Sequence, residues 1–224
     1  MAAVGEGRIT YDARGLAEPA AEAPRIAEID GDRATFDAHE LSTRLINLEL
    51  RRLLYEEGIG DVTVLNPGAK HSIGVGILTR CRITFEGSLG YFGCGLIDGP
   101  EIKIAGRVGA RTGIDQKGGT IIVAGDAGMM TGFMMQRGRM ILCGDVGHGL
   151  GDSMYDGTIY VAGKVASLGI DCVPGEWTDA DTEFVERKFR IHGLGSPPEL
   201  QKFVCGKKLY NYDNLEPSER KLVL

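Results

Sequence analysis

Short runs of alternating apolar and polar residues recur along the middle of the chain, and each run leads to a glycine. Six such glycines are spaced 19 residues apart: Gly68, Gly87, Gly106, Gly125, Gly144 and Gly163. The residues four and two positions before them are mostly aliphatic: Val64 and Asn66, Ile83 and Phe85, Ile102 and Ile104, Ile121 and Val123, Met140 and Leu142, Ile159 and Val161. Alternation with a period of two predicts one short β-strand in each repeat.

A second glycine pattern follows the predicted strand. The motif Gly-x-x-Gly-x-x-x-Gly begins at Gly106, Gly125 and Gly144, whereas the repeat that begins at Gly87 has Cys94 in the third place. Glycine permits the positive-φ corners and close backbone approach that a tightly coiled chain needs. We therefore expect an all-β fold, namely a right-handed parallel β-helix: a single-stranded solenoid of 19-residue coils over residues 62–169, with short α-helical flanks.

The segments on either side of the repeats have a different composition. Residues 1–24 are rich in Ala, Glu and Gly and predict a flexible N-terminal tail. Residues 25–61 predict an N-terminal cap, with a hairpin turn at Asp30-Gly31 and a helix over 40–57 that covers the open first coil. Residues 170–224 predict a helical and extended segment that docks on a partner.

Within this last segment, two helices are predicted. The first runs from Asp179 to Ile191 and ends at Gly193 and Gly195. The second would begin at Ser196, because Ser196-Pro197-Pro198-Glu199 has the form of a capping box with proline at the first helical position.

Composition and charge exclude several classes of protein. The net charge of −6 argues against a general nucleic-acid-binding protein, which needs a basic surface. The five cysteines fit neither a disulfide framework nor a zinc or iron–sulfur motif. No apolar stretch is long enough to span a membrane, and the N-terminus lacks the pattern of a secretory signal. We expect a cytoplasmic protein.

The residue that follows each repeat glycine offers the main catalytic candidates. Asp126 and Asp145 occupy this position in successive repeats, so their carboxylates should stack, and paired carboxylates about 5 Å apart serve retaining glycosidases. Arg107 and Lys164 hold the same position on either side of this pair. We therefore favour a surface ladder of ion pairs over a catalytic site.

His148 lies near Asp145 and Asp152 in the sequence, but no other histidine is in register with it. A metal ion requires three or four ligands, so a structural role is favoured. The run Gly147-His148-Gly149-Leu150-Gly151 resembles a phosphate loop, but its glycines belong to the 19-residue period. The sequence therefore predicts no catalytic, cofactor-binding or metal-binding residue in this chain.

Other residues are candidates for an interface with a partner. A solvent-facing strand position should be polar, yet three successive repeats carry Ile122, Ile141 and Tyr160 there, so we expect this face to be covered by the chain's own termini or by a partner. Met129, Met130, Met134 and Met135 form a dense cluster that is either internal packing or an adaptable contact surface. Tyr210 and Tyr212 alternate with charged residues in the C-terminal tail.

The Gly-x-x-Gly-x-x-x-Gly repeats resemble the C-terminal β-helix domain of the glutamate synthase family over roughly residues 37–170. Leu89-Gly90-Tyr91-Phe92-Gly93, Gly151-Asp152-Ser153-Met154-Tyr155 and Gly163-Lys164-Val165-Ala166-Ser167-Leu168-Gly169 are similar to the stand-alone β-helix subunit type found in N-methylglutamate synthase. In such assemblies the β-helix supplies no catalytic residue. One partner resembles an amidotransferase, and another binds FMN and an iron–sulfur cluster.

The resemblance implies a scaffold subunit of a complex that converts methylamine and L-glutamate to N-methyl-L-glutamate and ammonia. Two alternatives remain. The chain could belong to an ammonia- or glutamine-dependent glutamate synthase, which differs only in the amine that the partners accept. It could also be a free-standing carbohydrate-active enzyme that uses Asp126 and Asp145.

Overall fold

The computed structural model describes residues 25–206, and within this range a single ten-stranded sheet runs from one end of the fold to the other. The predictions for residues 1–24, Tyr210 and Tyr212 lie outside the described residues. In the order β1-β2-β3-β4-β5-β6-β7-β8-β10-β9, the strands are β1 (Glu28–Asp30), β2 (Arg33–Asp37), β3 (Asp61–Leu65), β4 (Arg82–Glu86), β5 (Glu101–Ile104), β6 (Thr120–Val123), β7 (Arg139–Leu142), β8 (Thr158–Val161), β10 (Gln201–Cys205) and β9 (Cys172–Pro174).

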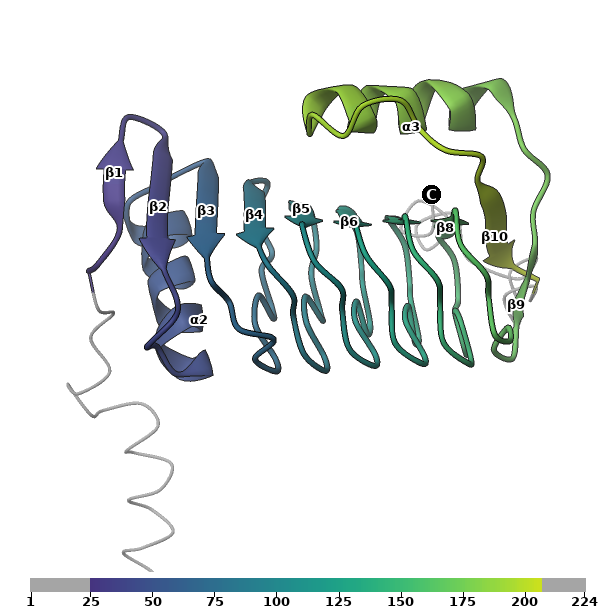
Figure 1. The fold of residues 1–224 in the computed structure, drawn as a ribbon, viewed down its shortest axis with the longest axis horizontal. Helices are drawn as coiled ribbons and strands as arrows, with labels where there is room; N and C mark the ends of the chain where they lie inside the picture. The colour runs from purple at the N-terminus through teal and green to yellow at the C-terminus, as the bar shows by residue number, and fades with distance from the viewer. Residues whose placement is uncertain (1–24, 207–224) are drawn as a thin grey trace, which may run out of the picture.

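The strands from β2 to β8 pair in parallel, each with the next one along the chain, and form a parallel β-solenoid (Figure 1). From β4 to β8, each residue pairs with the one 19 positions later, as Ile83 does with Ile102 and Ile102 with Ile121. The inward-facing side chains of these strands are fully buried in one core. A stack of aliphatic side chains between coils stabilises the fold through apolar burial.

The first coil departs from this register. Val62, not Val64, lies opposite Ile83, so the pairing from β3 to β4 spans 21 residues. The two additional residues fall in the corner after β3, where Asn66, Gly68 and Ala69 all have positive φ.

The prediction that Gly68 begins the glycine column is therefore wrong. The other five repeat glycines do stack. A Cβ atom would lie 2.8 Å from the backbone of Gly87 if built on Gly106, and 2.3 Å from that of Gly144 if built on Gly163. A Cβ on Gly68 would meet only Lys70 Nζ and the Asn66 carbonyl oxygen. Close backbone approach between coils thus explains the glycines from Gly106 onward, and close approach to the Pro67 ring explains Gly87, but neither applies to Gly68.

The N-terminal end of the solenoid is closed by a hairpin and a helix (Figure 1). β1 and β2 pair antiparallel around Gly31, whose φ is +59°. Helix α2 (Thr43–Arg51) begins at Ser42, whose side chain accepts a hydrogen bond from Leu45 N, and continues as a π-helical turn (Arg52–Glu56) before Gly58. The predicted hairpin and helix are confirmed, with the helix shorter than 40–57. The buried side chains of Ile46, Leu50 and Leu53 join the main core.

The C-terminal segment leaves the solenoid, forms helix α3 (Asp179–Ile191) over the outer face of the sheet, and returns as β10 (Figure 1). The predicted helix has these bounds, and Gly193 and Gly195 follow with positive φ. The helix predicted from Ser196 is wrong. Instead β10 pairs antiparallel with β8, supplying hydrogen-bond partners that the last strand of the stack would otherwise lack. None of the described helices combines the length and apolar character needed to cross a membrane.

Candidate functional site

Asp126 and Asp145 hold the backbone of the coil that follows each of them. Asp126 Oδ1 accepts a hydrogen bond from Asp145 N at 2.8 Å, and Asp145 Oδ1 accepts one from Lys164 N at 2.7 Å. Ser88 Oγ accepts from Arg107 N in the same way, at 3.2 Å. Within residues 25–206 no ion pair joins these aspartates to Arg107 or Lys164, so the predicted ion-pair ladder is wrong. The ladder is one of side chain to backbone hydrogen bonds.

His148 is exposed at the corner of its coil. Its Nδ1 lies 3.2 Å from Ser167 Oγ, which also accepts a hydrogen bond from Gly149 N. The Asp152 carboxylate instead accepts hydrogen bonds from Ser153 Oγ and Ile170 N. In the described part of the chain, no three His, Cys, Asp or Glu side chains gather to hold a metal ion. His148 and its neighbouring carboxylates thus join coils rather than form a ligand set.

In the coils that begin at Gly87, Gly106, Gly125 and Gly144, the corner after the glycine column contains three residues with left-handed backbone, as does the corresponding corner of the first coil. One column of such residues consists of Gly74, Cys94, Gly113, Gly132 and Gly151. This column explains the glycine in the third place of the motif, and Cys94, with a φ of +55°, adopts the same left-handed backbone without being glycine. The other two columns hold bulky side chains, including Phe92, Arg111 and Met130 in one and Leu96 and Met134 in the other. Such residues disfavour positive φ, at a cost of about 1–2 kcal/mol each.

These corners carry a row of apolar side chains, which we call the apolar edge: Tyr91, Phe92, Leu96, Ile114, Met129, Met130, Phe133 and Met134. Four of its members are large and exposed, from 38% for Phe92 to 54% for Tyr91. Hydrogen bonds tie the corners together from coil to coil, as from Arg111 N to Met129 O and from Met130 N to His148 O. Met135 does not belong to this surface, because it is fully buried in the core, and its assignment to an interface is wrong.

A groove of about 460 Å³ lies between the apolar edge and α2. Asn47 and Arg51 of the helix form one wall, and Phe92, Leu96 and Ile114 line the other. The guanidinium of Arg111 lies 5.8 Å from the centre of the Phe92 ring. Aromatic and aliphatic walls with nearby cations suit a protein segment more than a small polar substrate.

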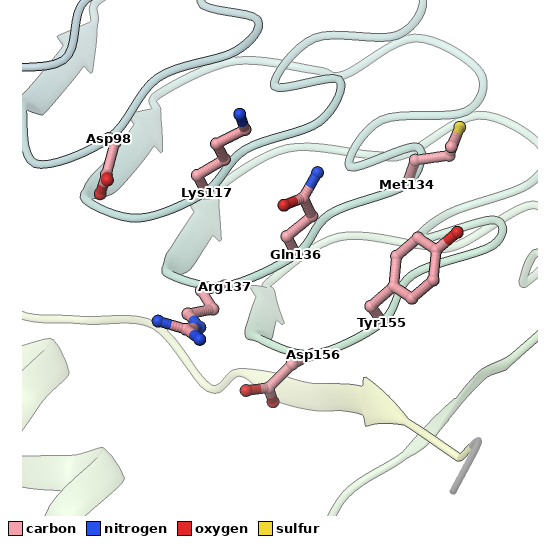
Figure 2. A pocket seen from close by; sticks show the side chains of 7 residues that line it. All are labelled: Asp98, Lys117, Met134, Gln136, Arg137, Tyr155 and Asp156. Atoms are coloured by element: carbon pink, nitrogen blue, oxygen red, sulfur yellow. The ribbon is translucent and has the colours of Figure 1, made fainter. Parts of the chain in front are cut away.

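A second groove, of about 550 Å³, runs across successive coils and shares Met134 with the apolar edge (Figure 2). Asp98, Lys117, Gln136 and Tyr155 come from successive coils, 19 residues apart, and Arg137, Asp156 and Met134 complete the lining. Figure 2 shows the charged side chains separated along the groove. They are solvent-exposed, and no ion pair joins them within the described ranges. Exposed, separated charges lack the fixed geometry that catalysis requires.

The outer face of β6–β8 is covered by the chain's own helix. Ile122, Ile141 and Tyr160 are fully buried and pack with Val185 and Phe189 of α3. The sequence left open whether the chain itself or a partner covers this face, and in the structure the chain itself covers it. The assignment of Ile122, Ile141 and Tyr160 to a partner interface is therefore wrong, because α3 fills that position.

At the start of α3, Asp181 fastens the helix to the sheet. Its carboxylate accepts hydrogen bonds from Tyr160 Oη, Lys202 Nζ and Thr178 N, each at 2.7 Å. Burial acts to raise the pKa of Asp181, but the hydrogen bonds from Lys202, Thr178 and Tyr160 outweigh it and hold that pKa below its ordinary value. Burial, together with Asp181, raises the pKa of the Tyr160 hydroxyl.

At the end of α3, Glu101 of β5 receives two basic side chains. Lys188 Nζ binds one carboxylate oxygen, and His192 Nε2 lies 2.6 Å from the other. The hydrogen bond with His192, opposed by burial and aided by Lys188, lowers the pKa of Glu101 to about 2. Sequence reasoning missed this cluster, although Glu101 at an outward strand position and two basic residues near the helix end were visible signals.

The structure thus groups the predicted residues differently from the sequence. It places Met129, Met130 and Met134 on one edge, buries Ile122, Ile141 and Tyr160 under α3, and assigns Asp126 and Asp145 to backbone contacts. No protein-family model, curated protein or solved structure was found to match this chain.

Proposed function

We propose that this chain is a non-catalytic β-helix scaffold subunit of a glutamate-synthase-like complex, most specifically of N-methylglutamate synthase type. The Gly-x-x-Gly-x-x-x-Gly repeats at Gly106, Gly125 and Gly144 support the family. We also propose that the solenoid is right-handed, because connections between adjacent parallel strands are right-handed in the great majority of proteins. The proposal also includes the 19-residue coil as the repeating unit and a cytoplasmic location.

The apolar edge is the observation that carries the proposal of a scaffold. Four side chains of the apolar edge belong to residues with the unfavourable left-handed backbone: Phe92, Leu96, Met130 and Met134. Phe92 and Leu96 are exposed, and Met130 and Met134 are only partly buried. Core packing therefore does not offset the conformational cost. A partner that covers these side chains would offset it by removing their apolar surface from water.

In this proposal the partners perform the chemistry. An amidotransferase-like subunit and an FMN-binding, glutamate-synthase-like subunit, with its iron–sulfur cluster, would be held at a fixed separation by the solenoid. The complex would convert methylamine and L-glutamate to N-methyl-L-glutamate and ammonia. A closely related proposal, with the same role for this chain, is a subunit of an ammonia- or glutamine-dependent glutamate synthase.

The carbohydrate-active alternative loses its main argument. Asp126 and Asp145 each accept a backbone hydrogen bond from the following coil, and this contact accounts for an acidic residue at both positions. No other observation in the described chain favours hydrolysis of a glycoside.

Purification of the tagged full chain from its own host tests the proposal. We expect co-purified proteins that bear flavin, detected by absorbance near 450 nm and by mass spectrometry. Met129→Asp with Leu96→Asp should release these proteins, whereas Ala124→Asp, an exposed control on the coil of Met129, should retain them. Asp126→Asn with Asp145→Asn should leave methylamine-dependent activity of the complex intact. Purification as a colourless single chain that hydrolyses glycosides would overturn the proposal.

A further inference from the structure

Two cysteines face each other where the chain returns to the sheet. β9 and β10 pair antiparallel, and Cys172 lies directly opposite Cys205. Backbone hydrogen bonds join the pairs around them, from Gly206 N to Asp171 O at 2.7 Å and from Gly175 N to Lys202 O at 2.8 Å. Because hydrogen-bonded and non-hydrogen-bonded pairs alternate in an antiparallel ladder, the two cysteines occupy a non-hydrogen-bonded pair.

This position is suited to a covalent link. Residues in a non-hydrogen-bonded pair have Cα atoms about 4.5 Å apart, with side chains on the same side of the sheet. A disulfide requires a Cα separation of about 4.4–6.8 Å. The two cysteines are not linked in this structure, and the pairing of β9 with β10 places them in the kind of cross-strand pair whose usual Cα separation falls within this range.

We propose that Cys172 and Cys205 form a redox modification site, at which a disulfide oxidant such as oxidised glutathione links them. The Cys205 thiolate attacks one sulfur of the oxidant and releases the first thiolate. The Cys172 thiolate then attacks Cys205 in the mixed disulfide and releases the second. Two protein thiols are oxidised, one disulfide is reduced, and the two thiol protons pass to solvent or to the released thiolates. This inference does not rest on the proposed function.

Burial fixes the order of the two steps. Cys172 is 5% exposed, and burial, together with the neighbouring Cys205, raises its pKa to about 12. Cys205 is only partly buried, and its thiol lies 3.1 Å from the Met154 carbonyl oxygen. An external oxidant therefore reaches Cys205 first. Cys172 reacts afterwards from the opposite strand, where proximity compensates for a small thiolate fraction.

The link would enclose the part of the chain that covers the sheet. Residues 173–204 contain α3, and β10, which follows it, pairs with β8. Joining Cys172 to Cys205 restricts the unfolded form of this segment, which favours the folded state in which α3 covers Ile122, Ile141 and Tyr160. Oxidation should thus stabilise the covered face against opening.

The test treats the full reduced chain with oxidised glutathione, quenches it in acid and alkylates it under denaturing conditions. Mass spectrometry after digestion without reductant should find one peptide pair linked through Cys172 and Cys205. The oxidised chain should melt several degrees higher than the reduced chain, and dithiothreitol should reverse both changes. Cys143 is a partly buried cysteine directly after β7, so Cys143→Ser serves as the matched control and should form the same link.

Cys205→Ser should abolish both the linked peptide and the rise in melting temperature. A glutathione adduct on Cys205 with Cys172 still alkylated would overturn the proposal, as would a link between any other two cysteines. If the Cys205→Ser variant fails to fold, the presence or absence of the linked peptide in the wild-type chain still decides whether the proposal holds.

Discussion

The outer face of the sheet has two halves that share one backbone geometry and differ in what lies over them. On β3–β5 the outward positions carry Thr63, Thr84 and Lys103, which remain partly exposed. On β6–β8 the same positions carry Ile122, Ile141 and Tyr160, which α3 buries completely. The inward-facing residues are apolar in both halves of the solenoid. The outward-facing residues differ: they are apolar where a second layer covers the sheet and polar where none does.

The two ends of α3 are fastened by charge, and its middle by apolar packing. Asp181 fixes the first turn and Glu101 receives the last, with Val185 and Phe189 between them. Buried, fully hydrogen-bonded ion pairs fix the position of a helix more than they add stability. We therefore expect loss of the apolar contacts to cost more than loss of either fastening.

A charge placed in each half of the face gives the largest expected contrast. Ile141→Asp buries an unpaired carboxylate beneath α3 and removes apolar packing, so it should lower the free energy of unfolding by about 4 kcal/mol. Thr84→Asp, at the equivalent outward position of the open half, should change it by about 0.5 kcal/mol or less. Urea unfolding followed by circular dichroism measures both. Equal effects would mean that α3 does not cover β7 in solution.

Removal of the charge at the start of α3 should have an intermediate effect. Asp181→Asn deprives Lys202 of its anionic partner in a buried setting, and we expect a loss of about 3 kcal/mol with faster amide exchange in α3. Glu186→Gln, on the exposed side of the same helix, is the control and should stay near wild type. Unchanged exchange in Asp181→Asn would show that the helix is held without this fastening.

The smallest expected effect is the pH dependence that Glu101 confers. Its pKa falls from an ordinary 4.5 to about 2 in the folded protein, so its stabilising contribution is present above pH 4.5 and is lost as the pH falls toward 2. At neutral pH this contribution is about 2–3 kcal/mol. The stability difference between wild type and Glu101→Gln should shrink over this interval in urea titrations. A constant difference down to pH 2 would contradict the contact with Lys188 and His192.

The sequence predicted the stack well because stacking leaves a strong periodic signal. Inward aliphatic residues and the glycines from Gly87 to Gly163 follow from coil-to-coil contact, which repeats along the chain. Gly68 was wrongly predicted to belong to the stacked column because it precedes Gly87 by 19 residues. Two additional residues in its corner shift the register between β3 and β4 to 21. A spacing of glycines alone does not distinguish a stacked glycine from one that serves a turn.

Contacts between distant segments were less predictable. Ile122 and Ile141 indicated a covered face, but nothing in residues 179–191 specified which surface their apolar side would meet. The capping-box pattern at Ser196 was local evidence for a helix, and the open edge of β8, a long-range feature, determined the outcome. The apolar edge was only partly visible, because the left-handed conformation of Phe92 and Leu96 becomes apparent only in the structure.

The reversed direction of β10 has a consequence for assembly. A parallel solenoid that ended at β8 would offer an edge onto which the first strand of another molecule could add in the same direction, and repeated addition would build a fibre. β10 blocks that edge with a strand of opposite polarity, and in the described part of the chain only the three-residue β9 lies beyond it. At the other end the three-residue β1 also runs antiparallel to its neighbour, so both ends of the stack, within residues 25–206, disfavour the addition of a further parallel strand.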